Sequence, residues 1–167
     1  MLARNQDRLL RWAAVMAQKS FSASVSAWVR KSEARIEAVF KSSAQDVISE
    51  MQEVGPSVAN PDSFGTGNLP VDTGFLRASL QAAINEPSPA IQFRPPSSTN
   101  VAYDASPVAL VIAGAKLGET IYATYGAVYA PAMEAKYGFV RLAAQNWGSI
   151  VARNARKAQQ LVEARAV

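Results

Sequence analysis

Apolar side chains recur at helical spacing in two long stretches, one in each half of the chain. In residues 28–53 they form a single stripe at steps of three and four residues, made up of Ile36, Val39, Phe40, Val47, Ile48 and Met51. From about residue 140 a second seam uses the same steps and consists of Val140, Ala144, Trp147, Val151, Asn154, Ala158 and Leu161. Both stretches predict long helices, and we expect the first stripe to pack in the core.

The residues before the first of these helices give a weaker signal. Residues 5–18 have apolar side chains on one side and predict a short amphipathic helix. Residues 20–27, "SFSASVSA", alternate serine with small or apolar residues. We interpret them as a linker between helices, with a short strand as the alternative.

The middle of the chain combines turn-forming residues with short apolar runs. Residues 55–70 are rich in Gly, Pro, Asn, Asp and Ser, which predicts the end of the helix and an exposed loop. Strand-like segments follow at 80–85 and 90–94, which flank "EPSPA" as a hairpin, and at 108–113 and 120–125. The predicted fold is α+β, with long N-terminal helices, a small mainly antiparallel β-sheet and a long C-terminal helix.

A chain of 167 residues, 49% of them apolar, is expected to form one soluble domain. Its predicted parts are N-terminal helices (1–53), an exposed loop (54–73), a turn with the sheet (74–126), and a loop with the C-terminal helix (127–167). The sequence contains no Cys and no His. This excludes disulfides, thiol nucleophiles, Cys/His zinc sites and histidine-based acid–base catalysis.

The net charge of +4 is unevenly distributed. Residues 136–167 carry six basic side chains and one acidic one, whereas residues 54–135 carry three and six. The common explanation for such a charged run is a solvated helix face. The alternative is contact with an acidic partner or with passing nucleic acid, for which the candidates are Arg153, Arg156, Lys157 and Arg165.

The Asp-Thr-Gly of residues 72–74 also occurs as the catalytic turn of aspartic proteases, but its surroundings argue against that chemistry. Such a protease needs two facing carboxylates. The residue after the glycine is normally small and is Phe75 here, and a Gly/Asn-rich loop precedes Asp72 where a buried strand is expected. We instead predict a structural turn, capped by an acid or hydroxyl side chain and made permissive by glycine. Its residues are Asp72, Thr73, Gly74, Leu76 and Arg77.

Two sequence blocks carry a resemblance to a known family. The first is a Val-Asp-Thr-Gly-x-Leu-Arg-x-Ser turn after a proline, here Pro70, Val71, Asp72, Thr73, Gly74, Leu76, Arg77 and Ser79. The second is Tyr-Ala-Pro followed by Glu, Gly, an aromatic residue and Arg, here Tyr129, Ala130, Pro131, Glu134, Gly138, Phe139 and Arg141. In this order, and with helices before and after them, the blocks resemble the tail-completion (tail-component) proteins of long-tailed bacteriophages, from about residue 28 to the end.

The chain departs from the family pattern in three places. Its loop at 55–69 is longer, Ala135 and Lys136 separate Glu134 from the aromatic residue and glycine, and Leu142 stands where proline commonly follows the arginine. The first departure affects the conformation of the loop, and the other two affect the local turn.

The resemblance implies a structural virion protein without catalytic activity, cofactor or metal, assembled in the host cytoplasm. Family members resemble ring-forming subunits. The expected assembly is a ring of six that completes the tail and joins it to the head around the DNA channel, beside tail-terminator and head-closure rings. Contact with the DNA is expected to be weak and independent of sequence.

Candidate interface or structural residues are Trp28, Tyr129, Pro131, Glu134, Gly138, Phe139, Arg141 and Trp147. Each tryptophan is large enough to serve as core or as an interface anchor. We expect Arg77 to pair with Asp72 and Arg141 with Glu134, within or between subunits. The loops at 55–70 and 95–106 are expected to order only against a partner ring.

Three alternatives to this function stay open. The chain could form another ring of the same particle, as a tail terminator or a minor capsid protein. It could be a small basic nucleic-acid-binding protein. The protease is the last alternative.

Overall fold

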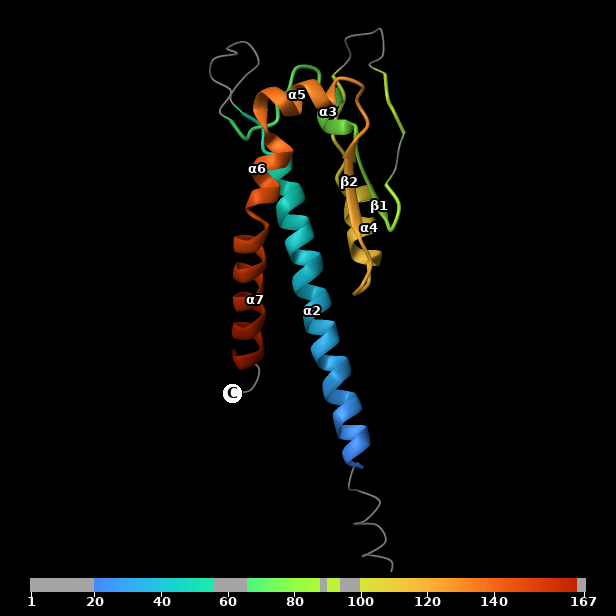
Figure 1. The fold of residues 1–167 in the computed structure, drawn as a ribbon, viewed down its shortest axis with the longest axis vertical. Helices are drawn as coiled ribbons and strands as arrows, with labels where there is room; N and C mark the ends of the chain where they lie inside the picture. Colours follow the sequence, from blue (N-terminus) through green and yellow to red (C-terminus); the bar gives the residue numbers. More distant parts are fainter. Residues whose placement is uncertain (1–19, 56–65, 88–89, 94–99, 165–167) are drawn as a thin grey trace, which may run out of the picture. The chain divides into compact units, whose positions relative to one another are not determined.

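A computed structural model describes residues 20–55, 66–87, 90–93 and 100–164 (Figure 1). The chain divides into two compact units, Met1–Arg35 and Ile36–Val167. Helix α2 (Phe21–Met51) begins in the first unit and ends in the second. The single domain expected from the sequence remains a prediction. The helix expected at 5–18 lies outside the described residues.

The described part of the first unit is the N-terminal half of α2. The Ser20 hydroxyl accepts the N–H of Ala23 at 3.2 Å, and the Ser20 carbonyl accepts the N–H of Ser24 at 3.0 Å. Ser20 therefore starts the helix as an N-terminal cap. The linker predicted at 20–27 was wrong, because one capping serine and the helix-compatible residues after it outweigh the alternating pattern.

In the second unit, two strands form the sheet. β1 (Leu80–Ile84) pairs antiparallel with β2 (Ile121–Tyr125), in a register that places Leu80 opposite Tyr125. The strand signals at 80–85 and 120–125 were therefore correct, but the hairpin with 90–94 was wrong. Gln92 instead forms an isolated parallel bridge with Ala127, just beyond β2.

The predicted strand at 108–113 is a helix, α4 (Ser106–Gly114). The carboxylate of Asp104 accepts the N–H of Ser106 at 2.9 Å, and a proline occupies the first helical turn. Both features favour a helix start. Only Val108 and Ile112, four residues apart, are buried in α4, and Leu110 is 73% exposed.

The C-terminal region was expected to be a loop from residue 127 followed by one helix from about residue 140, but it contains three helices, the first of them within the predicted loop. They are α5 (Ala130–Tyr137), α6 (Phe139–Gln145) and α7 (Trp147–Ala164). Asn154 of α7 is buried and hydrogen-bonded to Asp46 of α2, and Ile150 of α7 is also buried. The predicted seam was right at Asn154, but Leu161 on it is exposed and Ile150 beside it was missed.

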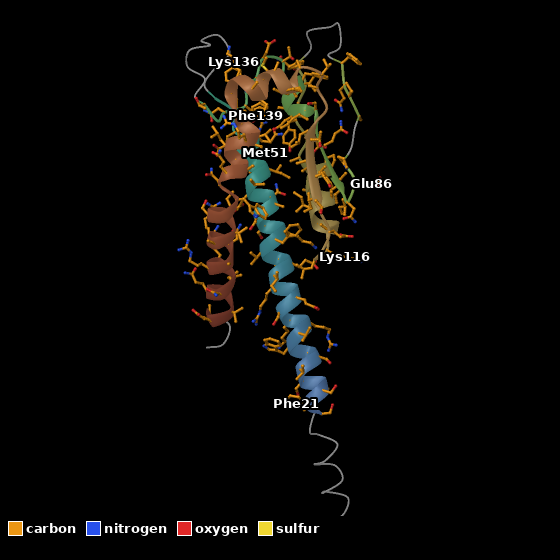
Figure 2. All side chains as sticks on the ribbon, in the orientation of Figure 1. Phe21, Met51, Glu86, Lys116, Lys136 and Phe139 are labelled. Carbon is orange, nitrogen blue, oxygen red and sulfur yellow. The ribbon has the colours of Figure 1, made fainter. Side chains whose placement is uncertain are left out.

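Two groups of buried side chains make up the core. The first joins the C-terminal half of α2 to β1, α4 and α6 through Ala44, Ile48, Met51, Leu80, Val108, Ile112 and Ala143. The second consists of Leu69, Phe75, Leu76, Ala127, Ala130, Tyr137 and Phe139. Partly buried Tyr125 and Val140 pack on both groups. Figure 2 labels Met51 and Phe139, one from each group, both of which contact Tyr125.

The stripe on α2 is buried only toward its C-terminal end. Ile48 and Met51 are enclosed, Val39, Phe40 and Val47 are partly buried, and Ile36 is 58% exposed. The α+β fold class is confirmed: the chain has long N- and C-terminal helices and a small two-stranded antiparallel sheet. Among the described helices, none combines the length and the apolar character that crossing a bilayer requires.

Candidate functional site

The first sequence block forms a turn that depends on glycine. Gly74 has φ 80° and precedes the short helix α3 (Phe75–Ala78). A Cβ at this position would lie 2.2 Å from the carbonyl oxygen of Val101. The N–H of Val101 in turn donates to the carbonyl of Thr73 at 2.7 Å. Close approach of two backbones therefore explains why glycine follows the threonine here.

The predicted side-chain cap of this turn was wrong. α3 has Gly74 at its N-cap position and no side-chain capping hydrogen bond. Asp72 is exposed. Phe75 and Leu76 are buried in the second core group, as the turn prediction required. The tripeptide thus connects a loop to the core through its backbone.

The side chain of Arg77 in the turn motif contacts the end of α2. Its Nε donates to the Oε1 of Gln52 at 3.2 Å. Its guanidinium lies 5.2 Å from the centre of the Tyr103 ring, at cation–π distance. These contacts connect Arg77 to the end of α2 and to Tyr103, and the ion pair with Asp72 stays a prediction.

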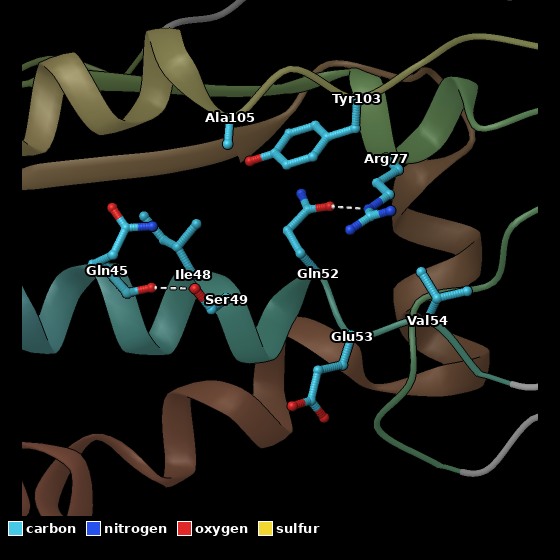
Figure 3. A pocket seen from close by; sticks show the side chains of 9 residues that line it. All are labelled: Gln45, Ile48, Ser49, Gln52, Glu53, Val54, Arg77, Tyr103 and Ala105. Carbon is cyan, nitrogen blue, oxygen red and sulfur yellow. Dashed lines mark hydrogen bonds between the residues drawn. The ribbon is translucent and has the colours of Figure 1, made fainter.

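The three side chains of Arg77, Gln52 and Tyr103 line an open cleft of about 490 Å³ beside α2 (Figure 3). The other residues that line it are Gln45, Ile48, Ser49, Glu53, Val54 and Ala105. Burial raises the pKa of the Tyr103 phenol, and Arg77 opposes that shift. The Nε2 of Gln52 is buried without a hydrogen-bond partner.

The second block forms a corner between two helices. Tyr129 is the N-cap residue of α5, and a proline stands in its first turn. Gly138, with φ 68°, is both the C-cap of α5 and the N-cap of α6. The two carboxylate oxygens of Glu134 accept the N–H groups of Val140 and Arg141 at 2.8 and 2.9 Å. Glu134 therefore supplies the cap of the helix that follows its own.

Glu134 accepts the backbone N–H of Arg141, and among the described residues no ion pair is found between the two side chains. The Arg141 side chain lies close to Gly138, where a Cβ would be 2.9 Å from an Arg141 Nη atom. Phe139 is 1% exposed and meets the Tyr125 ring edge-on, with ring centres 5.2 Å apart. Phe139 is therefore a core residue.

The two candidate tryptophans lie in different surroundings. Trp28 is 68% exposed on α2. Trp147 is 38% exposed and stands edge-on to Phe40, with ring centres 6.5 Å apart. Trp147 thus takes part in the packing of α7 on α2, whereas Trp28 leaves a large apolar surface open.

The basic residues of α7 do not act as one patch. Arg153 donates to the Oδ2 of Asp46 at 3.2 Å, so one of the four candidates is paired within the chain. Arg156 and Lys157 are exposed, and Arg165 lies outside the described residues. Asn154, between them, donates to Asp46 at 3.0 Å and to the Ser43 hydroxyl at 3.3 Å.

The two predicted loops are partly ordered by contacts within the chain. The residues 56–65 and 94–99 lie outside the described part. At the end of the first loop Leu69 is fully buried, and its N–H donates to the Glu53 carbonyl at 2.7 Å. In the second loop, Val101 and Tyr103 contact the first sequence block. The prediction that the loop 54–73 is exposed was therefore wrong at Leu69.

Sequence reasoning missed Gln52 and Tyr103 as partners of Arg77. A signal for Gln52 was present, because it is a polar residue four positions after Ile48 on the apolar stripe. In the described ranges, no group of three or more acidic side chains is arranged to hold a metal ion. No protein-family model matches the chain, and no curated protein or solved structure is significantly similar to it.

Proposed function

We propose that this chain is a structural subunit of the neck of a long-tailed bacteriophage. Copies of the chain form a ring that completes the tail and joins it to the head around the DNA channel. The observation that carries the proposal is the ordered pair of sequence blocks at 70–79 and 129–141. They agree with the family pattern in residue type and order, within an α+β domain framed by long helices.

The structural roles of the two blocks support this proposal. Gly74 allows a backbone contact at the first block, and Gly138 and Glu134 form the helix corner of the second. Both blocks therefore carry residues whose types are needed for backbone geometry. A protein that acts by assembly depends on the shape of its subunit, so residues that determine backbone geometry are expected in its sequence motifs.

A ring subunit also needs surface that a neighbouring copy can cover. The N-terminal half of α2 exposes the apolar side chains of Phe21, Val25, Trp28 and Val29. These residues fall at steps of three, four and seven on one helix and so share a face. In a ring, this exposed apolar face would be covered by a neighbouring subunit.

The test is the assembly state of the full chain. Mass photometry and negative-stain microscopy across a concentration series should find a closed ring with one subunit number. Antibody labelling of purified particles should place the protein at the neck. A chain that remains monomeric at every concentration and is missing from the neck would overturn the proposal. Tight binding to duplex DNA with a steep salt dependence would instead favour a nucleic-acid-binding protein.

A further inference from the structure

The cleft beside the end of α2 contains a buried hydrogen-bond donor that has no acceptor. Gln52 is 5% exposed, and its Nε2 has no hydrogen-bond partner in the structure. A buried donor left unpaired loses its hydrogen bonds to water without gaining a partner, which destabilises the fold. In Figure 3 the amide of Gln52 projects into the cleft, between Arg77 and Tyr103.

The orientation of this amide is fixed by its neighbour. Arginine has donors and no acceptor. Because the Nε of Arg77 donates to Gln52, the oxygen of the amide must face Arg77 and the nitrogen must face the opposite way. If the amide oxygen and nitrogen of Gln52 were exchanged, the NH₂ group of Gln52 would face the N–H of Arg77, and both groups are donors. The unpaired N–H is therefore a consequence of Arg77.

Arg77 is itself prepared for an acceptor. Its Nε is used by Gln52, and one face of the guanidinium lies over the Tyr103 ring. Within the described part of the chain, the Nη atoms of Arg77 make no hydrogen bond or ion pair. Stacking on the ring restricts the plane of the guanidinium, so the direction of the remaining N–H groups is set in advance.

The charges around the cleft favour a singly charged, planar acceptor. Arg77 contributes one positive charge, and burial keeps the Tyr103 phenol neutral by raising its pKa. Glu53 also borders the cleft, but its carboxylate points away from Gln52 and Arg77 in Figure 3. Asp104 is held by the N–H of Ser106. A second negative charge on the ligand would be repelled by Glu53 without a second cation to balance it.

The C-terminal end of α2 is close by, and a helix C-terminus disfavours anions. Its last carbonyls are occupied. The Tyr125 phenol donates to the carbonyl of Met51. The backbone N–H of Gln52 donates to the carbonyls of Ile48 and Ser49, and the backbone N–H of Glu53 donates to that of Glu50. These bonds reduce the negative potential that an incoming anion would meet, and Arg77 offsets the rest.

We propose that this cleft binds a carboxylate, with one oxygen accepting from the Nε2 of Gln52 and the other from the Nη groups of Arg77. Nε2 is closed off from solvent, so the proposal requires a small shift of the side chains around it when a carboxylate enters. Charge-assisted hydrogen bonds to both oxygens give the site its selectivity. The carboxylate comes from a free small molecule or from an acidic side chain of a neighbouring chain. The site itself does not depend on the proposed neck function.

The test is an NMR titration of the full, ¹⁵N-labelled protein with sodium acetate. The side-chain amide signal of Gln52 and the ring signals of Tyr103 should shift and saturate together. Sodium chloride at equal ionic strength and acetamide, the neutral analogue of acetate, should leave them in place. The amide signal of exposed Gln159 on α7 is the internal reference. Equal shifts with acetamide or chloride, or no saturable shift with acetate, would overturn the proposal.

Two variants sharpen the result. Arg77→Lys keeps the positive charge but loses the fork of donors, and Gln52→Met removes the amide donor. Each should weaken acetate binding about tenfold or more, whereas Gln159→Met should not change it. If Gln52→Met fails to fold, the wild-type titration and Arg77→Lys still decide. Unchanged affinity in a folded variant would count against the assignment.

A second arm distinguishes the two sources. Sedimentation of the protein with and without acetate reports whether acetate competes with contacts between chains. Dissociation of oligomers by acetate, together with the Gln52 shift, identifies a neighbouring carboxylate as the natural occupant. Oligomers that persist while the cleft is saturated identify a free small carboxylate. A chain that forms no ring but shows the saturable shift would contradict the proposed function and leave the carboxylate site standing.

Discussion

The phenol of Tyr125 in β2 donates a hydrogen bond of 2.9 Å to the main-chain carbonyl of Met51, the last residue of α2. The same side chain meets Phe139 of α6 edge-on. Burial raises the pKa of Tyr125 well above its usual range, so the phenol stays protonated and remains a donor. One residue therefore connects the sheet, the end of the long helix and the helix corner of the second sequence block.

Replacing Tyr125 with Phe should lower the free energy of unfolding by about 1–2 kcal/mol. The ring packing is kept, but the carbonyl of Met51 loses its partner at a helix end. Urea denaturation followed by circular dichroism measures the change. Tyr122→Phe in the same strand is the matched control, because Tyr122 is exposed. Equal stability of the two variants would show that the hydrogen bond contributes nothing.

Gly74→Ala should be strongly destabilising. A non-glycine residue at positive φ costs about 1–3 kcal/mol, and the new Cβ would lie 2.2 Å from the Val101 oxygen. Gly148→Ala should have the opposite sign and stabilise by about 0.5–1 kcal/mol. Gly148 lies in α7 with no atom near its missing Cβ. Thermal unfolding measures the stability of both variants. A Gly74→Ala variant as stable as the wild type would contradict the turn geometry.

Glu134→Ala should destabilise the second unit by about 1–2 kcal/mol, because two N–H groups at the start of α6 lose their acceptors. Glu134→Gln keeps one acceptor oxygen and should fall between this variant and the wild type. Amide hydrogen exchange at Val140 and Arg141 reports the loss directly. Glu163→Ala, at an exposed position of α7, should leave both exchange rates unchanged.

The contact between α2 and α7 should depend on pH in the acidic range. The hydrogen bond from Asn154 lowers the pKa of Asp46, with a further contribution from Arg153. A carboxylate whose folded pKa lies below its unfolded value of about 3.9 stabilises the fold above that pH. This contribution is lost as the pH falls through the folded pKa.

Asp46→Asn removes that titration. The stability difference between the wild type and Asp46→Asn should be constant from neutral pH down to about pH 5. Below that it should shrink. Denaturation curves at a series of pH values measure it. A difference that grows on acidification would contradict the assignment of the low pKa to Asp46.

Trp28→Ser should weaken self-association if the exposed face of α2 is an assembly surface. Loss of a central aromatic anchor typically costs 2 kcal/mol or more, which is about a thirtyfold rise in the dissociation constant. Leu161→Ser is the control, because Leu161 is exposed to a similar degree on α7, 62% against 68%. Similar effects of both changes would indicate non-specific hydrophobic association.

The sequence predicted the elements better than their pairing. The period of α2 and the strands around Leu80 and Ile121 were evident, because each depends on local spacing. The strand predicted at 108–113 was wrong, because six apolar residues in a row fit a buried strand and a helix equally well. The helix start at Asp104 and Ser106 carried the missing information. The hairpin was wrong because β1 takes a partner distant in sequence.

The candidate site was predictable only in part. Gly74 and Gly138 were evident from the sequence motifs, and both have a positive φ angle, which favours glycine. The partner of Arg77 was not evident, because Gln52 reaches it from another element and only the folded chain brings them together. Likewise, Asn154 was placed on an apolar seam, although its position there depends on Asp46 and Ser43 of the facing helix.

The shared glycine of the second block has a consequence for how this chain can vary in length. Gly138 ends α5 and begins α6, so no spare residue separates the two helices. One inserted residue would rotate everything after it by about 100° around the helix axis and swing Phe139 out of its packing against Tyr125. Homologous sequences should therefore tolerate substitutions at 135 and 136 far more readily than insertions or deletions between Glu134 and Val140.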